Sequence, residues 1–148
     1  MKAVRLLCAL PALAIAVAGA AQEGPQKLAA IRLNAGIHNI QAEVARTPDQ
    51  RATGLMFRET MPANDGMLFA FEEPATQCFW MKNTLLPLSA AFIADDGTVV
   101  NIEDMKARSL ESHCSAKPVR FVLEMNQGWF AKRGIKPGIR LQGSPFHP

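Results

Sequence analysis

The chain has 148 residues, of which 49% are hydrophobic and 20% are charged. This composition is typical of a globular protein with room for one domain and its core, and it leaves little room for a second domain. The formal net charge is +3, but two of the 16 basic residues, Lys2 and Arg5, lie in a start that we expect to be removed, which leaves 14 against 13 acidic residues. A nucleic-acid partner is therefore not expected, because phosphate binding needs a concentrated basic surface.

The first residues have the pattern of a cleavable signal peptide. Met1–Arg5 is a short basic start, residues 6–17 form an apolar run, and Ala18-Gly19-Ala20 offers the small residues that a signal peptidase needs. The alternative is a retained membrane anchor. A spanning helix needs about 20 apolar residues, however, and this run is shorter and contains Pro11. We expect export, with no membrane span after cleavage.

The predicted cleavage site divides the chain into three parts. Residues 1–21 are the signal peptide, residues 22–27 form a polar, flexible leader, and residues 28–148 form a single globular β-rich domain. The mature protein is expected to be periplasmic or secreted.

The first part of the domain reads as a hairpin followed by a helix. Leu28–Leu33 and Ile40–Val44 alternate apolar and polar residues, which is the strand pattern. Thr47-Pro48-Asp49-Gln50 has the composition of a capping box with proline at the first helical position. This motif predicts a helix from Pro48 to about Phe57, in which Gly54 indicates close approach by another backbone.

The middle of the chain is predicted to be strands. Met67–Phe71 is an apolar run of the buried type, and Cys78–Leu88 looks like a buried strand whose exit carries a lysine, an asparagine and a threonine. Asp95–Thr98 separates the apolar runs Ala90–Ala94 and Val99–Ile102, and its Asp-Gly pair is a strong hairpin signal.

The last part contains a long loop, two strands and a second helix. Met105–Pro118 is a polar loop, long enough to serve as a lid or a site wall. Phe121–Met125 is a strand, and Asn126 is predicted to cap a helix over residues 127–133. Gly134 is expected as its left-handed C-terminal residue, followed by the apolar contact of Ile135. Residues 139–141 form the last strand.

These elements define the predicted fold class. About seven strands and two short helices indicate a mainly β, β-rich α+β fold, built as a small antiparallel β-barrel or sandwich.

The cysteines follow from the predicted export. Cys8 would leave with the signal peptide, and Cys78 and Cys114 would remain as the one pair in an oxidising compartment. We expect them to form a disulfide. Two free thiols are the alternative, because bridging demands a geometry that sequence does not give. The scattered histidines and the lack of a C-x-x-C motif predict neither a metal site nor a cofactor.

Several long motifs, in order, resemble one family. They are TPDQRATGLMFRETMPANDGMLFAF, FWMKNTLLPL, DDGTVVNI and VLEMNQGWFAKRGIKPG. Across Ile40–Leu141 the chain resembles the bacterial and archaeal domain of unknown function 192. The resemblance implies a compact, mainly β domain, often exported, with no established reaction. The family usually has aspartate where this chain has Ser89 and Ile139, so a role carried by either aspartate does not transfer.

Lys82 is the most informative candidate for a site. An ammonium group at the end of an apolar strand must face water or lie beside an anion, and Glu124 and Glu59 are the candidate partners. The functional interpretation is a pocket for a small anionic or polar molecule. Its predicted ligand-binding residues are Arg51, Arg58, Lys82, Asn83, Thr84 and Glu124. The alternative interpretation is a structural salt bridge and turn.

Three other functions remain open. An exposed aromatic patch would make the protein an interaction module, and its candidates are Trp80, Trp129, Phe130 and Phe146, although both tryptophans are also typical core residues. Methionines with a cysteine or His113 could hold Cu(I), but methionine is also a common core residue. Acid–base catalysis by Lys82 and Glu124 would require a desolvated lysine. Non-catalytic binding is the leading hypothesis.

Overall fold

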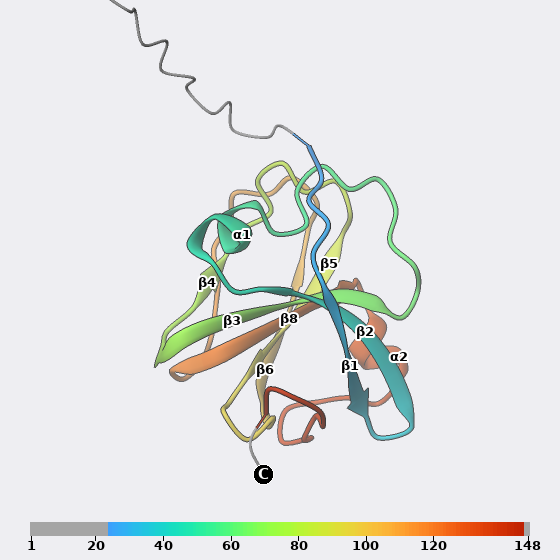
Figure 1. Cartoon of the computed structure of the whole chain (residues 1–148), viewed down its shortest axis with the longest axis vertical. Helices are drawn as coiled ribbons and strands as arrows, with labels where there is room; N and C mark the ends of the chain where they lie inside the picture. Colours follow the sequence, from blue (N-terminus) through green and yellow to red (C-terminus); the bar gives the residue numbers. More distant parts are fainter. Residues whose placement is uncertain (1–23, 147–148) are drawn as a thin grey trace, which may run out of the picture.

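A computed structural model of the chain describes residues 24–146, so the predicted signal peptide lies outside the described residues. Figure 1 shows the arrangement of the elements. In chain order they are β1 (Ala30–Ala35), β2 (His38–Ala45), α1 (Pro48–Thr53), β3 (Asp65–Ala75), β4 (Cys78–Phe79), β5 (Leu88–Ile93), β6 (Val99–Met105), β7 (His113–Cys114), β8 (Val119–Asn126) and α2 (Trp129–Lys132).

Six strands form one sheet in the order β1-β2-β3-β8-β5-β6, and β4 pairs with β7 in a separate ladder of two residues each. β8 is therefore a central strand, with β3 and β5 as its neighbours (Figure 1). The prediction of a β-rich α+β fold with two short helices is confirmed. The sheet is mixed rather than antiparallel, because α1 and the loop after it form a crossover that makes β3 parallel to β2.

The sheet is strongly curled but not a closed barrel. The segment after Gly138 reaches both edges of the sheet through single bridges. Its Arg140 pairs with Thr98, next to β6, and its Gln142 pairs with Asn34 of β1. These contacts cover part of each edge without forming a continuous ladder. The predicted barrel is thus approximated by a C-terminal segment that lies between the two edge strands.

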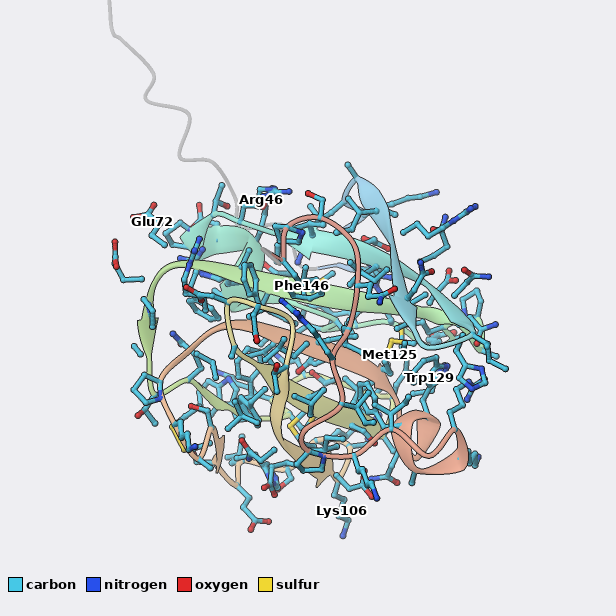
Figure 2. The ribbon with its side chains drawn as sticks, turned by 90° about the horizontal axis from the view of Figure 1, so that it is seen from below. Arg46, Glu72, Lys106, Met125, Trp129 and Phe146 are labelled. Carbon is cyan, nitrogen blue, oxygen red and sulfur yellow. A yellow bond between two sulfur atoms is a disulfide. The ribbon has the colours of Figure 1, made fainter. Side chains whose placement is uncertain are left out.

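The two faces of the sheet carry separate apolar clusters. On one face, which we call the α2-side core, Leu123 and Met125 of β8 pack with Trp129 and Phe130 of α2. Figure 2 shows Met125 and Trp129 near each other at the α2 end of the sheet. On the other face, the α1-side core, the buried residues include Leu55, Met67, Phe69, Met81 and Phe92. Glu124 alternates with Leu123 and Met125 along β8 and so belongs to the α1 side.

The first helix begins as predicted and ends earlier. The capping box is confirmed, since the Thr47 hydroxyl accepts from the Gln50 amide and the Gln50 side chain accepts from the Thr47 amide. α1 stops at Thr53 because Gly54 leaves the helical region with φ of 49°. A β-carbon on Gly54 would lie 3.1 Å from the Phe69 ring, so the close approach is by a side chain and not by another backbone.

The second helix is shorter than predicted, and Asn126 does not cap it. Asn126 ends β8, and its side-chain amide donates instead to the carbonyls of Met61 and Pro62. Gly128 occupies the N-cap position in the left-handed conformation. The predicted C-terminus is confirmed: Gly134 has φ of 67°, and the Ile135 amide reaches back to the Phe130 carbonyl.

The described part of the leader, a segment predicted from the sequence to be flexible, is hydrogen-bonded to α1 and to the loop after it. The Gln26 side-chain amide donates to the backbone carbonyls of Gln50 and Gly54, and the backbone carbonyl of Gln26 accepts from Arg58. Within residues 24–146, none of the helices has the length and apolar character needed to cross a membrane.

Candidate functional site

A cavity of about 250 Å³ lies on the α1 side of the sheet, bordered by α1 and the loop after it, β3 and β4. In Figure 1, α1 and β4 lie over the same side of the sheet. Aromatic side chains form much of the lining. The lining residues include Arg51, Gly54, Leu55, Phe69, Phe71, Cys78, Phe79, Trp80, Thr84 and Glu124.

Glu124 is the buried carboxyl group of this cavity. It projects from the central strand β8, where its register partners are Met67 of β3 and Ala90 of β5, both fully buried. Only 4% of Glu124 is exposed, and no other described residue forms a hydrogen bond or an ion pair with its carboxyl group. Burial raises the pKa of Glu124 to about 8, because a charged carboxylate is poorly solvated among apolar groups. The group is therefore mostly a neutral acid at pH 7.

Thr84 reaches the cavity from a turn, not from a strand. The buried strand predicted over residues 78–88 is limited to β4, because β4 finds only the two-residue strand β7 as a partner. The chain then turns, with Asn83 at φ of 54° and the Thr84 amide donating to the Met81 carbonyl. The Thr84 hydroxyl donates to the Lys82 carbonyl at 3.2 Å, so its oxygen can still accept a hydrogen bond.

Lys82 and Asn83 do not line the cavity. Both are exposed in the turn, and the Lys82 ammonium lies 5.5 Å from the centre of the Trp80 ring. The ion pairs of the described residues include none between Lys82 and Glu124 or Glu59. The predicted pairing of Lys82 with a glutamate is therefore wrong, because the turn directs the lysine away from β8.

Arg51 stands at the rim of the cavity. It is half-buried, its guanidinium group lies 4.8 Å from the centre of the Phe71 ring, and its Nη1 donates to the carbonyls of Ala70 and Arg46. The backbone carbonyls of neighbouring elements thus fix the position of this charge.

Arg58 belongs to a different place in the fold. Its two terminal nitrogens each lie 2.8 Å from an oxygen of Glu43. Burial by itself would raise the pKa of Glu43, but hydrogen bonds from Arg58 and from the Leu28 amide, with the Arg58 charge, outweigh it and lower that pKa. This bidentate pair ties the leader and the loop after α1 to β2, and it lines a separate, more open cavity of about 620 Å³.

The cavity thus brings together Arg51, Thr84 and Glu124 from the predicted set, and not Arg58, Lys82 or Asn83. Sequence analysis missed its aromatic walls. The available signal was the pair Phe79-Trp80 directly after Cys78, read there as part of a buried strand.

A disulfide joins Cys78 and Cys114, as expected from the sequence. The two residues are directly opposite each other in the β4–β7 ladder, with their α-carbons 4.1 Å apart. Because Cys78 also lines the cavity, the bridge fixes one wall of the site to the long loop after β6.

The residues of the predicted aromatic patch do not form one exposed surface. Trp129 and Phe130 are 3% and 1% exposed, and Phe146 packs edge-on to Phe121. Of the predicted aromatic patch, only Trp80 is an exposed large side chain, at 52%.

The copper site loses its thiolate ligands to the disulfide. Its methionines divide between the cores, with Met67, Met81 and Met105 on the α1 side and Met125 on the α2 side. Acid–base catalysis by Lys82 with Glu124 loses the contact between the two side chains, as described above.

Comparisons with known proteins agree with this fold. The family model DUF192, described as "Uncharacterized ACR", matches residues 30–143. A proposed transcription regulator from Sinorhizobium meliloti 1021 is 43% identical, with a TM-score of 0.72 over 76% of this chain and 91% of that chain. A protein of unknown function from Novosphingobium aromaticivorans DSM 12444 is 35% identical, with a TM-score of 0.75 over 78% of this chain and 86% of that chain. No curated protein matches the chain.

Proposed function

This chain belongs to the DUF192 family, and because that family is described as uncharacterised, we propose a function from the chain's own cavity: the exported protein binds a small polar molecule over Glu124 without catalysis.

The observation that carries the proposal is the unpaired buried carboxyl group. Only 4% of Glu124 is exposed, and no other described residue forms a hydrogen bond or an ion pair with its carboxyl group. Its oxygens are nevertheless not among the fully enclosed polar atoms of the described residues, because they border the cavity. Glu124 borders an open cavity instead of being enclosed by the core. A bound molecule would supply the missing partner, and strongly perturbed carboxyl groups in cavities are typical of binding and active sites.

The rest of the cavity suits binding. Phe69, Phe71, Phe79 and Trp80 provide apolar contact area, and the Thr84 hydroxyl oxygen can accept one oriented hydrogen bond. The volume of about 250 Å³ is below the usual range for drug-sized ligands, about 300–1,000 Å³. The ligand is therefore small.

Binding is favoured over catalysis because the cavity offers a single titratable acid. Among its lining residues, Arg51 and Glu124 are the charged ones, and Cys78 is held in the disulfide. Nucleophilic chemistry typically uses a nucleophile hydrogen-bonded to its base, and no lining residue forms a hydrogen bond with the Glu124 carboxyl group.

Export rests on the N-terminal sequence and is consistent with the disulfide. Disulfides persist in oxidising compartments such as the periplasm. The mature protein should therefore begin near residue 21 or 22 when it is isolated from the periplasm or medium of the host.

Native mass spectrometry on the mature protein from its own compartment tests the proposal. We expect a retained small molecule in the wild type and its loss in Glu124→Leu, which removes the polar group while keeping similar volume. Lys82→Ala is the matched control, since Lys82 lies outside the cavity lining. Loss of the bound mass in Lys82→Ala, with retention in Glu124→Leu, would contradict binding in the cavity and would indicate a site at the turn that carries Lys82.

A further inference from the structure

We propose that the ligand of this cavity is a small organic cation, an alkylammonium or amidinium group, bound by the carboxylate of Glu124 and by the surrounding aromatic rings. This inference rests on the function proposed above and adds the chemical class of the ligand.

None of the cations among the described residues forms an ion pair with Glu124. Across the sheet it faces Met67 of β3 and Ala90 of β5. From the cavity walls it faces Thr84, the disulfide-bonded Cys78 and the aromatic rings, and Arg51 at the rim is the other charged lining residue. A buried carboxylate needs a paired cation to be stable. Because the Arg51 guanidinium donates to two backbone carbonyls and not to Glu124, a cationic ligand would supply the paired charge.

The aromatic walls favour the same class of ligand. Aromatic faces attract cations that come within about 6 Å of the ring centre. Two lining rings already have a cation of the chain beside them, with the Arg51 guanidinium 4.8 Å from Phe71 and the Lys82 ammonium 5.5 Å from Trp80. The lining rings that remain for a ligand cation are therefore Phe69 and Phe79. Phe69 and Phe79, which also line the cavity, lie edge to face with 4.8 Å between their ring centres. An ammonium group inside the cavity would meet a carboxyl group and these two rings together.

The sequence predicts a small anionic or polar ligand, and the structure removes most of the support for the anionic class. Lys82 is outside the lining, and Arg58 is paired with Glu43. Arg51 remains, but two backbone carbonyls already accept hydrogen bonds from its Nη1. An anion would also lie beside a carboxyl group that must stay protonated to avoid repulsion.

Binding of a cation displaces a proton. Below pH 8 the free Glu124 is mostly the neutral acid, since burial raises its pKa to about 8. As the ammonium group enters, the O–H bond of Glu124 breaks, the proton leaves to solvent, and a carboxylate–ammonium pair remains. The net charge of the cavity is then the same as before binding. Affinity for a cation should therefore rise about tenfold per pH unit below pH 8 and level off above it.

Three probes of similar size and different charge test the inference: n-propylammonium, propionamide and propionate. Each is titrated into the mature protein at pH 6, 7 and 8, and binding is followed by NMR shifts of the Thr84 amide and the Trp80 indole N–H. We expect n-propylammonium to bind most tightly, with an affinity about tenfold higher at pH 7 than at pH 6. In Glu124→Gln, its affinity should fall at least tenfold and lose the pH dependence. Glu73→Gln, the same change at an exposed position, should behave as wild type.

The Glu124 carboxyl carbon gives a second readout on the wild-type protein. Its carbon-13 shift should titrate near pH 8 in the free protein and at lower pH with n-propylammonium bound. A preference for propionamide or propionate would overturn the cation and leave the binding function standing. If none of the three probes shifts the cavity signals, the cation is overturned and the binding function loses support as well.

Discussion

Glu43 and Glu124 are the same residue type in opposite surroundings. Glu43 receives two hydrogen bonds from Arg58 and one from the Leu28 amide, and its pKa is lowered although burial opposes this. Glu124 receives none from the described residues, and burial alone raises its pKa. The first glutamate is an anion paired with Arg58, and the second is a neutral acid that borders the cavity.

The raised pKa of Glu124 predicts how stability depends on pH. The folded state holds this proton up to about pH 8, whereas the unfolded chain releases it near pH 4.5, the ordinary value for glutamate. Its contribution to the free energy of unfolding is therefore complete below pH 4.5 and is lost as pH rises to about 8. The difference between wild type and Glu124→Gln should change by about 1.4 kcal/mol per pH unit inside this window. Urea unfolding of both proteins at pH 5, 6, 7 and 8 measures it.

Taking the difference from Glu124→Gln cancels the other titrating groups to a first approximation. Glu73→Gln, at an exposed position, should give a difference that does not vary with pH. A flat difference for Glu124→Gln would mean that the carboxyl group is already ionised in the folded protein.

Sequence reading found the unusual residues but not their directions. A lysine after an apolar run and a glutamate inside one are both visible in the sequence as exceptions to the apolar pattern, and both are predicted site residues. Which way each side chain points depends on the register of β8 and on the left-handed conformation of Asn83, which turns the chain before Thr84. Those features depend on pairing between distant strands and on one turn, and alternation of residue types does not encode them.

At the scale of elements, local signals were reliable and long-range pairing was not. The capping box at Thr47 and the glycine that ends α2 can each be predicted from a few neighbouring residues, because the backbone groups that they satisfy are close in sequence. The parallel pairing of β2 with β3 and the two-residue ladder of β4 with β7 join distant segments. Neither pairing has a local signature, so the predicted antiparallel sheet and the long strand from Cys78 were wrong.

The end of α2 supports a prediction about Gly134. Its φ of 67° is a conformation that a β-carbon disfavours, yet no atom lies within 4 Å of where that carbon would be. Gly134→Ala should therefore cost about 1 kcal/mol of unfolding free energy, from backbone strain and not from a clash. Gly134→Asn should cost less, because asparagine tolerates the left-handed region better. Equal losses in the two variants, measured by urea unfolding, would contradict strain as the cause.

For the whole molecule, the site depends on where β8 lies. As the central strand it has neighbours on both sides, so its alternate side chains enter two separate apolar clusters. The α2-side core is closed by α2, whereas on the α1 side a short helix and the small β4–β7 ladder leave the cavity over Glu124. A family of mainly β domains could be recognised from the sequence, but this asymmetry between the faces arises only when all six strands are assembled.

The last prediction concerns the C-terminal segment that reaches both edges of the sheet. Gly97 has φ of 89°, and a β-carbon there would lie 2.4 Å from the Leu141 carbonyl oxygen. Gly36 has φ of 59° with no atom within 4 Å, so it is the matched control. Gly36→Ala should cost about 1 kcal/mol from strain, and Gly97→Ala about 3 kcal/mol, because the close contact adds to the strain. Since the segment must move, Gly97→Ala should also speed hydrogen exchange at the amides of Asn34 and Val99, which donate to Gln142 and Ile139. Equal costs in the two variants, with unchanged exchange at both amides, would mean that the segment does not hold the sheet edges.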